Sequence, residues 1–186
     1  MTKSTPRLED LRVPNIGNVH GGSYLITGLP RIRSAWLAAV LSHDDLICYH
    51  EAPTTAMPPI NSGFPFGLCD PGAACLYPRA ALNLFGGTRI VIIARTAKQS
   101  RRALEKFAGG PATNWDAIED RYNFFVTNVP EPYFVEFSDL NNYETVDRLH
   151  RFVTGRGLDR QRFNLFDGLR IEQDVVKRAQ QEGQAA

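Results

Sequence analysis

Residues 23–41 read SYLITGLPRIRSAWLAAVL, and this stretch decides the fold. Its first part, residues 23–27, is a short apolar run with aromatic and β-branched members, which is typical of a buried strand. Its last part, residues 34–42, carries apolar side chains at helical spacing and opens with Ser34, which we expect to cap the helix. Backbone N–H groups are unpaired at a helix start, and the helix dipole favours negative charge there. The strand, loop and helix start therefore predict an anion site.

Two side chains of the loop add to this prediction. The guanidinium of Arg31 has the geometry to hold two phosphate or sulfate oxygens, and the hydroxyl of Ser34 is a further donor. The loop is not a Walker A motif, which needs a second glycine and a lysine where Arg33 and Ser34 stand, so a nucleoside triphosphatase is not expected. An ordinary strand–turn–helix with surface arginines is the alternative interpretation.

The rest of the chain alternates strand and helix patterns, which predicts βαβ units and a parallel sheet. Further strands are expected at 46–50, 66–69, 88–94 and 133–137, a turn at 70–72, and helices at 79–85, 97–108, 114–125, 145–153 and 170–180. Residues 88–94 form a nearly continuous apolar run, which suits a strand covered on both faces. We expect an α/β fold in three α/β/α layers, with 23–27 and 88–94 as neighbouring inner strands. Residues 1–22 are interpreted as an N-terminal arm and 23–186 as a single domain.

Composition narrows the function classes. The net charge of the 186 residues is +1, so no bulk charge predicts binding to nucleic acid or to an anionic membrane. The three cysteines include no CxxC, and no His, Cys, Asp or Glu cluster has metal-ligand spacing, so reduced thiols and no metal are expected. The chain has no apolar run that fits a signal peptide or a membrane span, so we expect a soluble, cytoplasmic protein.

The loop resembles that of the sulfotransferase family, whose pattern is G-x-P-[RK]-S-G-T-T-W-L. The matching residues are Gly28, Pro30, Arg31, Trp36 and Leu37. Four further segments are similar to motifs of that family and come in the same order, namely CYHE at 48–51, FGLCD at 66–70, IIAR at 92–95 and FVEFSDL at 134–140. The resemblance spans about residues 23–155. It implies a P-loop-like fold and a sulfuryl transfer from 3′-phosphoadenosine-5′-phosphosulfate (PAPS) to a small-molecule hydroxyl or amine.

The resemblance also implies residue roles. The cofactor-binding set would be Gly28, Pro30, Arg31, Arg33, Ser34, Ala35, Trp36, Arg95 and Ser100. The catalytic set would be Glu51, His50 and Arg31, with a carboxylate or imidazole taking the proton of the acceptor. The chain departs from the family at Arg33, where the pattern has glycine, and at Ala103, where a serine is expected; Ser100 is the candidate substitute.

A structural role is the alternative for several of these residues. Glu51 could be a solvated acid, and His50 a buried core histidine that points away from Glu51 because strand side chains alternate. Trp36 is expected to pack in the core, and Asp70 to cap a turn.

Two other functions stay open. The same fold could hold a nucleotide or a protein partner without turnover, or it could be a phosphotransferase, although the Walker lysine and Mg²⁺ ligands are missing. A small-molecule acceptor is the expected partner, and homodimerisation stays open.

Overall fold

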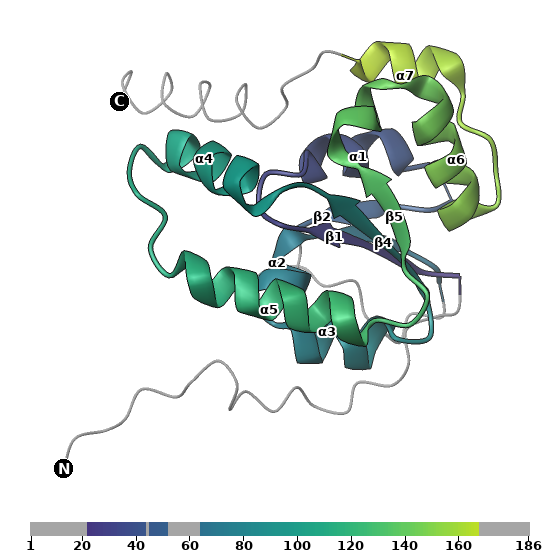
Figure 1. The fold of residues 1–186 in the computed structure, drawn as a ribbon. Coiled ribbons are helices and arrows are strands. Elements are labelled where there is room, and N and C mark those ends of the chain that lie inside the picture. The colour runs from purple at the N-terminus through teal and green to yellow at the C-terminus, as the bar shows by residue number, and fades with distance from the viewer. Residues whose placement is uncertain (1–21, 44, 52–63, 168–186) are drawn as a thin grey trace, which may run out of the picture.

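A computed structural model describes residues 22–43, 45–51 and 64–167, and the remaining residues are the grey trace in Figure 1. The described chain forms a five-stranded sheet in which every strand pair is parallel. The strands are β1 (Tyr24–Gly28), β2 (Cys48–His50), β3 (Gly67–Cys69), β4 (Arg89–Ala94) and β5 (Tyr133–Glu136), and their order is β2-β3-β1-β4-β5. The predicted α/β class and parallel sheet are confirmed.

The two strands with continuous apolar sequence are neighbours at the centre of the sheet. β1 pairs with β4 from Tyr24↔Arg89 to Gly28↔Ile93, and every residue of β1 is buried. This confirms the prediction that 23–27 and 88–94 lie side by side. A strand buried on both faces needs no polar alternation, and this explains why the two sequences read as apolar runs.

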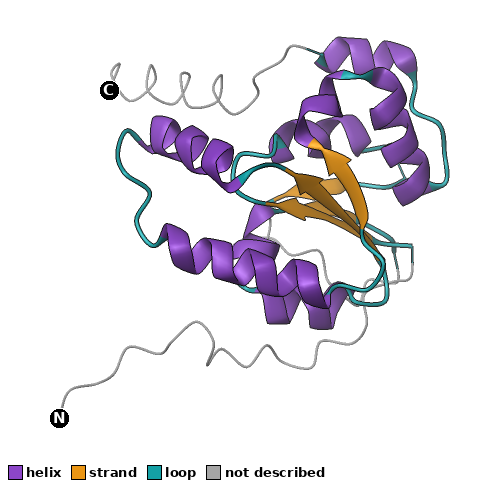
Figure 2. Cartoon of the chain, viewed as in Figure 1, coloured by secondary structure: helices purple, strands orange, loops and turns teal. Residues whose placement is uncertain are grey.

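Helices cover both faces of the sheet, so the domain has three layers (Figures 1 and 2). One core joins Tyr24, Ile26 and Ile93 to helices α1 (Ser34–Leu41), α6 (Tyr143–Thr154) and α7 (Arg160–Phe166). The other joins Leu25 and Ile92 to helices α2 (Pro71–Cys75), α3 (Pro78–Phe85) and α5 (Trp115–Asn128). Alternate residues of each central strand thus serve opposite layers, as the pleat requires.

Most helix boundaries lie close to the predicted ones, and α4 (Ala97–Ala108) matches its predicted range. The predicted turn at 70–72 is wrong, because helix α2 begins there: Asp70 is its N-cap and Pro71 its first residue. Proline is well tolerated at that position since its missing N–H would be unpaired anyway. The short 3-10 helix Phe137–Asn141 and helix α7 were not predicted. The expected arm at 1–22 and helix at 170–180 lie outside the described residues, except for Gly22.

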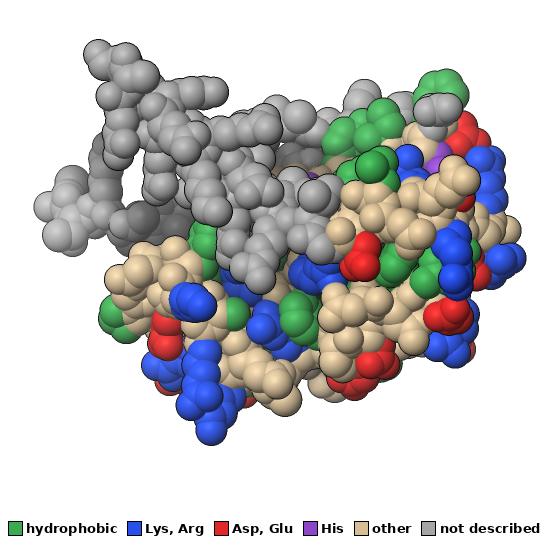
Figure 3. Space-filling view, turned by 90° about the horizontal axis from the view of Figure 1, so that it is seen from above, with side chains coloured by type: hydrophobic (Ala, Val, Ile, Leu, Met, Phe, Trp, Pro, Cys, Tyr) green, Lys and Arg blue, Asp and Glu red, His purple; other side chains and the backbone are tan. Residues whose placement is uncertain are grey.

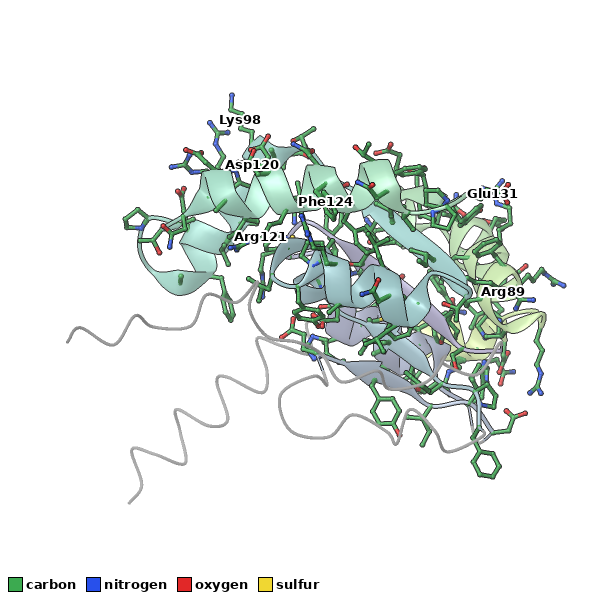
Figure 4. All side chains as sticks on the ribbon, turned by 90° about the horizontal axis from the view of Figure 1, so that it is seen from below. Arg89, Lys98, Asp120, Arg121, Phe124 and Glu131 are labelled. Atoms are coloured by element: carbon green, nitrogen blue, oxygen red, sulfur yellow. The ribbon has the colours of Figure 1, made fainter. Side chains whose placement is uncertain are left out.

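The view from below in Figure 4 distinguishes the two ends of the sheet. Arg89 opens β4 and Glu131 precedes β5, and both lie at the end where strands begin. Lys98 of α4 lies at the opposite end, beyond the carboxyl ends of the strands. No helix among the described residues is long and apolar enough to cross a membrane.

Candidate functional site

The connections that leave β1 and β4 run toward opposite edges of the sheet. From β1 it runs through α1 to β2 on one side, whereas from β4 it runs through α4 and α5 to β5 on the other side. Helices α1 and α5 belong to opposite layers, as right-handed crossovers in opposite directions require. The loops that follow β1 and β4 therefore turn to opposite faces of the sheet and leave a gap between them at the carboxyl ends of these strands. Open α/β sheets bind ligands at this place.

The β1–α1 loop, residues 29–33, has an unusual backbone. Arg31 and Arg33 both have left-handed conformations, with φ of 71° and 62°. Leu29, which precedes both arginines, and Ile32, which lies between them, are buried. Each packs in a different one of the two cores and so fixes the loop to the domain. A Cβ on Gly28 would lie 2.6 Å from the carbonyl oxygen of Ile93, so only glycine allows β1 and β4 to approach this closely as the loop begins.

The start of α1 differs from its prediction. Ser34 is the first helical residue and not the cap; the N-cap is Arg33, which makes no side-chain capping bond. The side chain of Ser34 is buried and its Oγ lies 3.1 Å from Nε2 of His50. Arg33 makes no capping bond and the first turn of α1 holds no acidic residue, but the carboxylate of Glu51, which accepts a hydrogen bond from Ser34, reaches the positive end of the helix dipole.

Two arginines approach each other where the loops after β1 and β4 separate. Nη1 of Arg95, which follows β4, donates to the backbone oxygen of Arg31 in the loop. Each guanidinium lies over an aromatic ring, that of Arg31 4.0 Å from the ring centre of Phe107 and that of Arg95 4.1 Å from that of Phe137. Burial, and then the nearby charge of Arg31, lower the pKa of Arg95. Arg31 and Arg95 therefore lie together at this edge of the sheet.

The third arginine of this region points elsewhere. Arg33 donates from Nη1 to Oδ1 of Asn141 at 2.7 Å and stacks on the ring of Trp36 at 4.1 Å. Its guanidinium is thereby held between α1 and the 3-10 helix. Trp36 is buried, as expected of a packing residue, and its indole N–H donates to the backbone oxygen of Phe166.

His50 and Glu51 lie on the other side of the loop and touch each other. Nε2 of His50 is 3.3 Å from Oε1 of Glu51, and the two side chains are 32% and 52% exposed. The expectation of a buried histidine that points away from Glu51 is wrong. The strand ends at His50, and Glu51 has φ 46°, so the alternation of side chains stops there and the carboxylate turns back to the imidazole.

The charges around Glu51 keep it ionised. The hydrogen bond from His50 is the main cause that lowers the pKa of Glu51, and the charges of His50 and Arg31 and a hydrogen bond from Ser34 lower it further. Burial acts in the opposite direction but is outweighed. Ser34, His50, Glu51 and Arg31 therefore form one electrostatic group beside the loop.

Asp70 completes the edge of the sheet on the β3 side. It is 3% exposed, its Oδ1 accepts from the backbone N–H of Gly72 at 2.7 Å, and its Oδ2 has no hydrogen-bond partner among the described residues. Burial and the charge of Glu51 raise the pKa of Asp70 to about 6. The carboxyl group caps a backbone N–H as predicted, although at the start of a helix and not in a turn, and its burial was not predicted.

The last predicted residues lie in the β1–α1 loop and in the first turns of α1 and α4. Pro30 of the loop and Ala35, the second residue of α1, are half-buried. Ser100 is fully buried, and its Oγ and the Nε of Arg95 have no hydrogen-bond partner within the described part of the chain. Sequence reasoning missed Phe107, Phe137 and Asn141, which hold the three arginines. An aromatic residue within a basic helix is a weak signal, and only the fold brings these partners to the arginines.

Comparisons with known proteins add no assignment to this geometry. A scan of protein-family models, a search of curated proteins and a search of solved structures each gave no match. Among the described residues, no group of three or more His, Cys, Asp or Glu side chains could hold a metal ion.

Proposed function

We propose that this chain is a sulfotransferase-like enzyme that binds PAPS at the β1–α1 loop and transfers its sulfuryl group to a small hydroxyl or amine. The observation that carries the proposal is the meeting of Arg31 and Arg95 above the gap between β1 and β4. Seen from above, Lys and Arg side chains gather beside hydrophobic ones on one face of the molecule (Figure 3). Cations next to apolar surface suit a ligand with both phosphates and a flat base.

The residues present fit the anionic groups of PAPS. The backbone N–H groups at the start of α1, with Arg31 beside them, would hold the 5′-phosphosulfate. Arg95 and Ser100 would hold the 3′-phosphate, because both keep a buried donor with no partner among the described residues and buried polar groups are normally hydrogen-bonded. Arg33 stands at the glycine position of the family pattern and takes up a left-handed conformation, which is one that glycine adopts readily.

PAPS supplies the sulfuryl group, and its transfer forms a bond from the acceptor oxygen or nitrogen to sulfur and breaks the bond from sulfur to the bridging phosphate oxygen. The chain must then take the proton of the acceptor and balance the charge left on the phosphate. His50 and Glu51 are the candidate proton acceptors, and Arg31 is a cation whose charge acts on Glu51. Ser34 holds His50 at hydrogen-bond distance and so fixes the orientation of the imidazole.

Titration calorimetry with adenosine 3′,5′-bisphosphate, the product left by PAPS, tests the binding part. We expect Arg31→Ala and Arg95→Ala each to weaken binding by about 10-fold or more, as loss of a charge-assisted hydrogen bond does. Arg148→Ala is the control, since Arg148 is an exposed arginine of α6 whose guanidinium donates a hydrogen bond to Thr145. Equal affinities of the wild type and both loop variants would refute the proposed site.

A binding module without turnover is the second candidate, and the position of Arg33 favours it. The guanidinium of Arg33 is engaged with Asn141 and Trp36, so it gives the leaving phosphate no cation. Bisphosphate binding together with no release of bisphosphate from PAPS, across a panel of phenols, alcohols and primary amines, would favour the module. Turnover with any acceptor, reduced by on the order of 100-fold or more in Glu51→Gln or His50→Gln, would favour the enzyme.

A further inference from the structure

Glu51 and Asp70 lie at the same level on adjacent strands. The parallel register pairs His50 of β2 with Cys69 of β3, so the residues that follow the two strands, Glu51 and Asp70, lie at the same edge of the sheet. The backbone N–H of Glu51 donates to the backbone oxygen of Cys69, so the two segments stay paired up to that point. Adjacent strands are about 4.8 Å apart, so two carboxyl groups flank the edge next to the β1–α1 loop.

Asp70 is bound on one side only. Its Oδ1 caps α2 through Gly72, and its Oδ2 is buried without a partner among the described residues. A capping role needs one oxygen and does not require burial, since Asp159 caps α7 through Gln161 from an exposed position. A buried carboxylate with an unpaired oxygen is costly, so capping alone does not explain this side chain.

We propose that Asp70 is a positioning residue of the transfer centre, which acts through His50: its charge, added to that of Glu51, favours the protonated imidazole formed when an acceptor gives up its proton. This inference rests on the proposed function. The titratable groups around Asp70 are His50 and Glu51 from the β2 end, Cys69 of β3, Cys75 of α2, and Tyr77, whose ring lies beside the same glycine of α2 as the carboxyl group. Among these groups, only His50 can gain positive charge.

The charge of Asp70 depends on pH in a useful range. Its pKa is raised to about 6, because the carboxyl is buried and Glu51 is negative, while the charge of His50 acts in the opposite direction. Asp70 therefore becomes negative as the pH rises through 6, and from there on His50 is flanked by two carboxylates. The proton released by the acceptor passes to the imidazole, and no other reactant is needed. We expect kcat to rise through this pH range.

The test compares Asp70→Asn with Asp159→Asn in the full chain. Asparagine keeps the capping oxygen and removes the charge, so both variants retain their helix caps. With PAPS and a phenol, alcohol or amine acceptor, we expect Asp70→Asn to lower kcat on the order of 10-fold and to give a pH profile of kcat near pH 6 that differs from that of wild type. Bisphosphate affinity should not change in either variant. A pH profile of Asp70→Asn that matches that of Asp159→Asn would overturn the inference.

A second measurement needs no turnover. The carboxyl carbon of Asp70, followed by NMR, should titrate near pH 6 in the wild type, and Glu51→Gln should lower that midpoint because a negative neighbour is removed. If no acceptor is ever sulfated, the proposed function fails, yet this titration still decides whether the carboxyl groups are coupled. A midpoint near pH 4 that Glu51→Gln leaves unchanged would overturn the coupling, whatever the activity.

Discussion

Replacing Arg33 tests how the anion loop is built. Arg33 is left-handed, with φ 62°, at the position where the sulfotransferase pattern has glycine. Left-handed backbone costs an ordinary residue about 1–2 kcal/mol, and glycine avoids this cost. Glycine in turn loses about 0.4–1 kcal/mol because its unfolded chain is freer. We therefore expect Arg33→Gly to be more stable than Arg33→Ala by about 0.5–1 kcal/mol.

Both variants lose the same side-chain contacts, so their difference isolates the backbone. The bond to Asn141 is expected to contribute about 0.5–1.5 kcal/mol, and the stack on Trp36 about 0.5–1 kcal/mol. Relative to wild type, Arg33→Ala should lose about 1–2.5 kcal/mol of unfolding free energy, and Arg33→Gly should lose less. Urea denaturation measures these differences, which correspond to about 2–4 °C in Tm per kcal/mol in a chain of this size.

The same pair of variants reports on the ligand. If the loop binds the 5′-phosphosulfate through its backbone, Arg33→Gly should bind adenosine 3′,5′-bisphosphate and PAPS at least as tightly as wild type. PAPS binding that appears only in Arg33→Gly would mean that the natural protein no longer uses this donor. An Ala variant as stable as the Gly variant would refute the left-handed conformation, and with it the proposed loop geometry.

Three further outcomes are expected. Gly28→Ala should cost about 1–3 kcal/mol of unfolding free energy in urea, because the new Cβ would meet the Ile93 carbonyl at 2.6 Å; a neutral result would contradict the close approach of β1 and β4. Between pH 4 and 6 the native state binds the proton of Asp70 more tightly than the unfolded chain does, so wild type loses up to about 3 kcal/mol of stability relative to Asp70→Asn as the pH rises. Urea curves of both proteins at pH 4 and pH 8 should show this loss. Burial lowers the pKa of His150, so the unfolded chain takes up a proton there before the native state does as the pH falls through about 6.5. Below that pH, wild type should therefore lose stability more steeply than His150→Gln. The same dependence of unfolding free energy on pH in both proteins, measured in urea, would contradict this.

The sequence predicted the parts of the fold that depend on local pattern. The apolar runs of β1 and β4 predicted their central positions in the sheet, because a strand covered on both faces tolerates few polar residues. Helix α7 was missed because Arg160–Phe166 is short and follows a glycine-containing segment, so its periodicity is weak. Its Phe163 packs against Trp36, a contact across the chain that no local pattern contains.

The candidate site was predicted less completely, because backbone turns decide where its side chains point. Strand alternation placed His50 and Glu51 on opposite faces, but the left-handed conformation of Glu51 returns its carboxylate to the imidazole. Asp70 reads in sequence as an ordinary cap before Pro71. Its burial follows from the position of β3 between β2 and β1, which is a property of the sheet order and not of the local residues.

The arginines of the site show how one set of contacts fixes both the backbone and the charges of this loop. Arg33 adopts a left-handed conformation, and its side chain is held by Trp36 and Asn141. The contacts that offset the backbone strain are the same ones that turn its guanidinium away from the loop. Charge at the anion site then depends on Arg31 and Arg95, which come from two strands and meet only if β1 and β4 are adjacent. A donor that needs two separated cations is therefore compatible with this loop, and a donor that needs a third at Arg33 is not.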